Sequence, residues 1–175
     1  MTTPSTPPPA TGYVGETLAL LGDRDPIAIM AETPAWVAAR LEGRSLAQLR
    51  QPEAPGKWSL VQVVAHLADT EIAYGWRARM ILTAEQPPIH GFDQGAWLER
   101  FDYASDDPSQ ALQTFTALRQ WNLRVWRRGS NPADLTRTGI HSERGPESLD
   151  TLRRLAAGHD LRHRRQIERI LRVLG

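Results

Sequence analysis

The chain has 175 residues, of which 41% are hydrophobic and 23% charged, and its net charge is +1. This length fits one domain with a substantial core, and the near-neutral charge argues against nucleic acid as a main partner. No apolar run approaches the roughly 20 residues that span a bilayer, so we expect no membrane segment. The absence of cysteine excludes disulfides and a cysteine nucleophile, and it fits a cytoplasmic location.

The N-terminal residues 1–11 are rich in proline and threonine, and they are expected to form a disordered tail ahead of one folded domain, residues 12–175. Asp25 followed by Pro26 predicts the start of a helix that closes near Gly43. The residues that follow are predicted to form a connection that contains a short turn.

The second long helix is predicted from Ser59 to about Thr83. Ser59 and Gln62 have the spacing of a capping box, and an apolar run follows directly. Good helix formers continue until two consecutive prolines, Pro87 and Pro88, end the pattern.

The second half of the chain contains two more long helical patterns. Residues 92–103 predict a short helix or ordered turn, and 107–129 predict a long helix that begins with Asp-Pro. Residues 131–145 are polar and predict a loop, and the last helix runs from near 148 to about 171. No segment alternates convincingly, so the sequence predicts an all-α protein, a four-helix bundle with short extra helices.

The last helix places two histidines on its apolar face. Steps of three or four residues connect the members of that face: Leu149, Leu152, Ala156, His159, His163, Ile167 and Ile170. Two histidines four positions apart have Cβ atoms roughly 5–6 Å apart, which lets both rings reach one metal ion. The alternative is a pair of core histidines that each form a hydrogen bond to a neighbour.

A third histidine, His66, lies in the middle of the second helix at the edge of its apolar face. Three buried imidazoles without partners would cost roughly 1–3 kcal/mol each, and one shared metal ion would satisfy them all. His66, His159 and His163 are therefore the predicted metal ligands. Three protein ligands leave coordination positions open, which is typical of a catalytic site.

Several short motifs in this order resemble the DinB-like superfamily, and most closely its YfiT branch of metal-dependent hydrolases. The motifs are Gly56–Leu60, His66–Asp69, Arg77–Trp97, His141–Glu143 and His159–Ile167. The resemblance implies a four-helix bundle that holds zinc or nickel through one histidine of the second helix and two of the last. Those positions correspond to His66, His159 and His163.

The resemblance implies a hydrolase that acts on a small molecule with water activated by the metal ion. The first alternative is a transferase or isomerase that uses a low-molecular-weight thiol, whose sulfur the ion would hold as a thiolate. The second alternative is a non-catalytic stress-response module that binds a partner. A homodimer is expected because it is the commonest symmetric assembly.

Two further residues are candidates for catalysis. Glu71 lies about one turn beyond His66 and could act as a general base, or it could be a carboxylate that faces solvent or lies behind the metal ligands. His141 lies in a predicted loop that the resemblance brings near the metal, where it could contact substrate, or it could be an ordinary surface histidine.

Overall fold

The structure is a computed structural model that describes residues 12–175, so the predicted tail at 1–11 lies outside the described residues. The helices and strands follow one another along the chain as α1 (Gly12–Leu21), α2 (Pro26–Leu41), α3 (Leu46–Arg50), α4 (Leu60–Thr83), β1 (Pro88–Ile89), α5 (Gln94–Arg100), α6 (Pro108–Arg128), α7 (Pro132–Leu135), β2 (Thr138–His141), β3 (Gly145–Ser148) and α8 (Leu149–Leu174).

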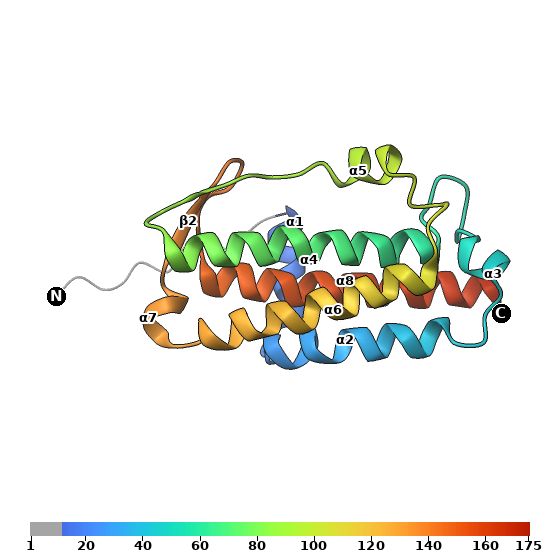
Figure 1. Cartoon of the computed structure of the whole chain (residues 1–175), viewed down its shortest axis with the longest axis horizontal. Coiled ribbons are helices and arrows are strands. Elements are labelled where there is room, and N and C mark those ends of the chain that lie inside the picture. The colour runs from blue at the N-terminus through green and yellow to red at the C-terminus, as the bar shows by residue number, and fades with distance from the viewer. Residues whose placement is uncertain (1–11) are drawn as a thin grey trace.

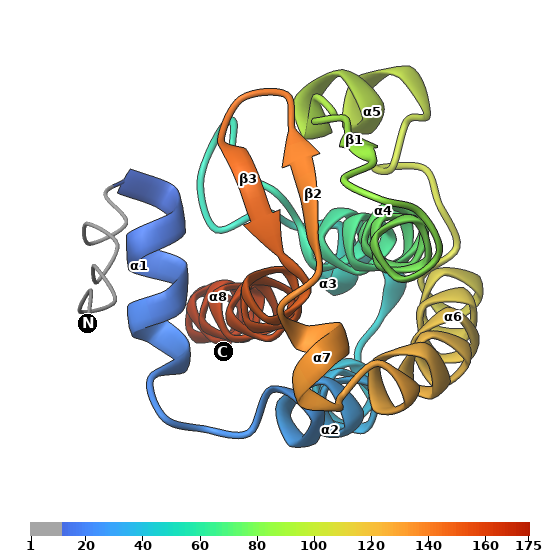
Figure 2. The ribbon, with the colours of Figure 1, turned by 90° about the vertical axis from the view of Figure 1, so that its left-hand side faces the viewer.

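The four long helices α2, α4, α6 and α8 run along the molecule and form a four-helix bundle (Figure 1). Each long helix contacts two of the other three: α4 packs on α6 and α8, and α2 packs on the same two helices. The short helix α1 packs against the outer side of α8, as Figure 2 shows in a view along the bundle. The predicted fold class, a helical four-helix bundle with short extra helices, is confirmed.

The helix starts predicted from the sequence have the expected hydrogen bonds. The Ser59 hydroxyl accepts from the backbone N–H of Gln62, and the Gln62 side chain accepts from the backbone N–H of Ser59 at 2.8 Å. Asp107 accepts from the backbone N–H of Gln110 at 2.8 Å and so caps α6. These caps satisfy N–H groups that a helix leaves without partners, so they fix where α4 and α6 begin.

The prediction of a loop over 131–145 was wrong. This segment contains α7 and the strand β2, which pairs antiparallel with β3 and parallel with β1 in a three-stranded sheet. Strands of two to four residues are too short to show a convincing alternation, and β1 lies about 50 positions from its partner β2. Figure 2 shows the sheet at one side of the bundle, above α4 and α8.

The apolar core consists of two clusters at different heights in the bundle. One joins the second half of α4 to the first half of α8, and the other joins the first half of α4 to the last turns of α8. Between them lies a group of buried polar residues, which comprises His66, Thr70, Glu71, Arg119, Asn122, His159, Asp160 and His163. A polar layer in the middle of a bundle is costly unless its groups are paired, so it marks the candidate functional site.

Candidate metal centre

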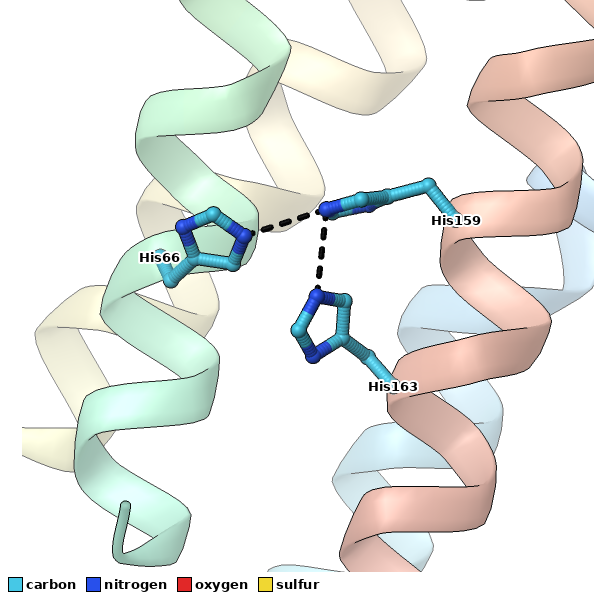
Figure 3. A group of neighbouring side chains, drawn as sticks. All are labelled: His66, His159 and His163. Atoms are coloured by element: carbon cyan, nitrogen blue, oxygen red, sulfur yellow. Dashed lines mark hydrogen bonds between the residues drawn. The ribbon is translucent and has the colours of Figure 1, made fainter. Parts of the chain in front are cut away.

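Three imidazoles from α4 and α8 converge in this polar layer (Figure 3). Nε2 of His159 lies 3.0 Å from Nε2 of His66 and 3.1 Å from Nε2 of His163. One ring nitrogen from each residue lies within 4.8 Å of the other two, and the residues are 1%, 4% and 8% exposed for His66, His159 and His163. The structure therefore brings together the three histidines that the sequence singles out.

The geometry fits one shared cation better than hydrogen bonds among the rings. A proton on Nε2 of His159 can point to only one of its two neighbours, which leaves the third ring unsatisfied. Nitrogen atoms that bind one zinc ion at 2.0–2.1 Å in tetrahedral geometry lie roughly 3.3 Å apart. The two distances of 3.0 and 3.1 Å are close to that separation. The third pair of nitrogens, those of His66 and His163, lies within 4.8 Å, so the three residues fit one shared divalent ion.

Contacts behind the rings orient two of the three imidazoles. Nδ1–H of His163 donates to Oε1 of Gln166 at 2.8 Å, so the lone pair of its Nε2 is free to face the centre. The indole of Trp58 lies parallel to the His163 ring, with centroids 6.2 Å apart, and edge-on to His66 at 5.0 Å. Nδ1 of His159 has no hydrogen-bond partner among residues 12–175.

Burial keeps these imidazoles neutral at ordinary pH. It lowers the pKa of His66 to about 3, with a smaller contribution from the nearby His163. Burial also lowers the pKa of His163 to about 4, although Gln166 and Asp160 act in the opposite direction. The pKa of His159 is lowered as well, first by burial and then by the other two rings. Neutral imidazole is the form that binds metal ions.

The histidines border two adjoining cavities. A cavity of about 320 Å³ is lined by His66 and His159, and a larger hollow of about 1110 Å³ is lined by His163. Tyr13 and Gln94 line both, so these two side chains stand between the cavities. Space in which a ligand would fit therefore lies beside all three rings.

Glu71 is not placed where a general base would be needed. Its carboxylate accepts from Arg119 at 2.8 Å and from the side-chain amide of Asn122 at 3.1 Å, and it lines neither cavity beside the histidines. Glu71 lies five positions after His66, so its side chain leaves α4 on a different face. The alternative of a solvent-facing carboxylate was wrong, because Glu71 is only 2% exposed, and its partners Arg119 and Asn122 are not among the predicted metal ligands.

His141 lies at the end of β2 and lines the 320 Å³ cavity together with His66 and His159. Its ring is buried, and Nδ1 accepts from the backbone N–H of Glu143 at 3.1 Å. Burial lowers the pKa of His141, and the nearby Arg144 lowers it further. The interpretation as an exposed surface histidine was wrong, because strand pairing turns this ring inward.

Sequence reasoning missed the buried charges that share the layer with the histidines. Arg119 of α6 donates to Asp160 of α8 and Glu71 of α4, and also to the backbone oxygen of Met30 of α2. One guanidinium of α6 therefore contacts the other three long helices. A charged side chain at a core position of an amphipathic helix was the available signal, since Arg119 is four positions from Phe115.

The fold and the site together define a four-helix bundle whose candidate metal centre is formed by side chains of facing helices. The core of a helix bundle is an established location for metal sites. The sequence model of the family described as the DinB superfamily matches residues 30–167 of this chain. The chain belongs to the DinB superfamily, and the resemblance seen in its sequence motifs is confirmed.

Several relatives carry the provisional name of metal-dependent hydrolase. YfiT of Bacillus subtilis is 37% identical over 86 residues, which cover 49% of this chain and 48% of that protein. OB0782 of Oceanobacillus iheyensis is 31% identical over 118 residues, which cover 66% of each chain. The alignment with the first of these relatives thus spans about half of its length.

The structure of YfiT from Bacillus subtilis has the same fold, with a TM-score of 0.78 and 25% sequence identity. The similarity covers 96% of this chain and 92% of that one. That protein is described as a probable metal-dependent hydrolase with an unusual four-helix bundle topology. Within the described part of this chain, no helix is long and apolar enough to cross a membrane.

Proposed function

We propose that this protein is a metal-dependent hydrolase in which His66, His159 and His163 hold one zinc or nickel ion. The observation that carries the proposal is the convergence of three buried Nε2 atoms, 3.0 and 3.1 Å apart, from two helices. A divalent ion supplies Lewis-acid chemistry, because it activates water as a nucleophile near neutral pH and polarises an oxygen of the substrate. Relatives named for metal-dependent hydrolysis support the same function.

The residues of the chain would bind, orient and enclose the reactants. The three neutral rings leave the charge of the ion uncancelled, and Gln166 keeps the His163 ring turned toward it. The 320 Å³ cavity beside His66 and His159 has the volume of a small-molecule site. His141 lines that cavity and is proposed to contact the substrate, whereas Glu71 is already engaged by Arg119.

A second candidate function uses the same centre to transfer or isomerise a low-molecular-weight thiol. The observation in its favour is the pair of cavities that adjoin at Tyr13 and Gln94, which offers space for two reactants. Because the chain has no cysteine, the sulfur must arrive with a ligand. The cytoplasmic location and the homodimer stay predictions of the sequence.

The two functions are separated by offering the metal-loaded protein a thiol and an electrophile. Glutathione, mycothiol or bacillithiol is mixed with monochlorobimane, and a panel of ester and amide substrates is tested in parallel. Metal-dependent hydrolysis without conjugation supports the hydrolase, and metal-dependent conjugation supports the thiol transferase. His163→Ala should abolish turnover in either case while circular dichroism shows a folded bundle. If His163→Ala left the turnover unchanged, both proposals would be wrong.

A further inference from the structure

The larger hollow beside His163 carries a concentration of positive charge. It lies between α1, α8 and the segment before α4, and Trp58 and His163 are among its lining residues. Its cationic lining residues come from the turn after α1, the segment before α4 and α8 itself: Arg24, Lys57, Arg162, Arg165 and Arg169. Glu16 and Glu53 are its acidic lining residues, so the hollow has an excess of three positive charges in a chain whose net charge is +1.

Two of these cations are already neutralised by the two carboxylates. Arg162 lies 3.3 Å from Glu16, and Arg169 lies 3.3 Å from Glu53. Each pair joins α8 to another part of the wall. Exposed ion pairs of this kind contribute at most about 1 kcal/mol to stability.

The remaining cations give the hollow its positive field. The guanidinium of Arg24 donates to the backbone oxygens of Leu20 and Leu21 at the C-terminal end of α1, and it forms no ion pair with a carboxylate between residues 12 and 175. Lys57 and Arg165 form no ion pair with any residue between 12 and 175. Several charges of one sign around a concave surface focus the electrostatic potential inside it and raise the local concentration of ions of the other sign.

We propose that this hollow binds the anionic group, a carboxylate or a phosphate, of a small organic ligand next to His163. The assignment of that ligand as the substrate of the metal centre rests on the proposed function, whereas the binding of the anion does not. His163 lines the hollow, and its Nε2 lies 3.1 Å from Nε2 of His159. A ligand anchored by Lys57 and Arg165 would thus extend toward the metal centre.

The shape of the hollow favours a small ligand over nucleic acid. The cations line a single concave space of about 1110 Å³, and Trp58 is also part of its lining. A nucleic-acid surface needs a stripe of positive charge that follows a phosphate backbone, and the chain as a whole is nearly neutral. The volume suits a molecule of metabolite size.

The test is calorimetric titration of the full chain with succinate and, separately, with sulfate at low ionic strength. Each titration is done with metal-free and with zinc-loaded protein, so that anion binding is measured independently of the metal. We expect saturable binding of at least one dianion and a loss of affinity as salt is added. A preference for succinate indicates a carboxylate ligand, and a preference for sulfate indicates a phosphate-like one.

The double variant Lys57→Gln/Arg165→Gln should weaken this binding about tenfold or more, since it removes two charged contacts. The matched control Arg124→Gln/Arg128→Gln removes the same charge from exposed positions of α6, across the bundle from α1 (Figure 2), and should change the Kd less than about twofold. Equal weakening in both variants, or no saturable binding in the wild type, would overturn the proposal. Saturable, Lys57-dependent binding of the anion, together with a failure of the protein to bind either zinc or nickel, would uphold the anion site and contradict the proposed function.

Discussion

Arg119 and Asp160 form a two-point ion pair in the centre of the bundle. Nη1 of Arg119 lies 2.6 Å from Oδ2 of Asp160, and Nη2 lies 2.9 Å from Oδ1, with the two side chains only 2% and 1% exposed. Asp160 directly follows His159, and the same guanidinium reaches Glu71 on α4. The pair therefore joins the two helices that carry the histidines through a third helix, α6.

Arg119→Met should destabilise the fold strongly. The substitution leaves the carboxylates of Glu71 and Asp160 buried without their cation, and breaking a buried pair in this way costs about 3–5 kcal/mol. Urea unfolding followed by circular dichroism measures the change. Arg124→Met, at an exposed position of the same helix, is the control and should change the unfolding free energy by less than about 0.5 kcal/mol. Equal stabilities of the two variants would show that the buried pair does not hold the bundle together.

Gly158→Ala should loosen the contact between α1 and α8. A Cβ atom at this position would lie 2.4 Å from the backbone oxygen of Thr17, which cannot turn aside as a flexible side chain could. We expect a loss of about 1–3 kcal/mol, the usual cost of overpacking. Hydrogen exchange should show faster exchange in α1 and little change in α6. A variant with wild-type stability and unchanged exchange in α1 would refute the close packing of the two helices.

The metal-free protein should lose stability as the pH falls below about 6.5. In the folded chain the pKa is lowered to about 3 for His66 and about 4 for His163, so between pH 6.5 and 4 the unfolded chain binds more protons. Stability therefore rises with pH in this window, by up to about 1.4 kcal/mol per pH unit for each such histidine. Urea titrations at several pH values measure the slope.

The control for that slope is His163→Gln, which removes one of the titrating groups. Its unfolding free energy should depend less steeply on pH than that of the wild type over the same window. A slope that is the same in both proteins would mean that the buried rings are not the source of the pH dependence.

Local features of the sequence were sufficient to predict the long helices and to single out the three histidines that face the core. The capping box of Ser59 and Gln62, a motif of only four residues, marks the start of α4. The spacing of His159 and His163 places both rings on one helix face. His66 could be added because it also falls on a core-facing position. These inferences need only the periodicity of a helix, which is set by neighbours along the chain.

Features that depend on distant parts of the chain could not be predicted. Pro88 and Ile89 form a strand only because Ile140 and His141 lie beside them, and that pairing is what turns His141 into the cavity. The partner of Glu71 is Arg119, 48 positions away, so the sequence alone could not distinguish a general base from a buried ion pair. Helix α1 has two glycines and depends on packing against α8.

The most direct test is the metal content of untagged protein, measured by elemental analysis and by calorimetric titration with zinc and nickel. We predict one divalent ion per chain in the wild type and a loss of affinity of at least a hundredfold in His66→Ala, His159→Ala and His163→Ala, while Glu71→Gln keeps a bound ion. Stoichiometric binding that persists in the three alanine variants, or no binding to the wild type, would contradict the three-histidine centre.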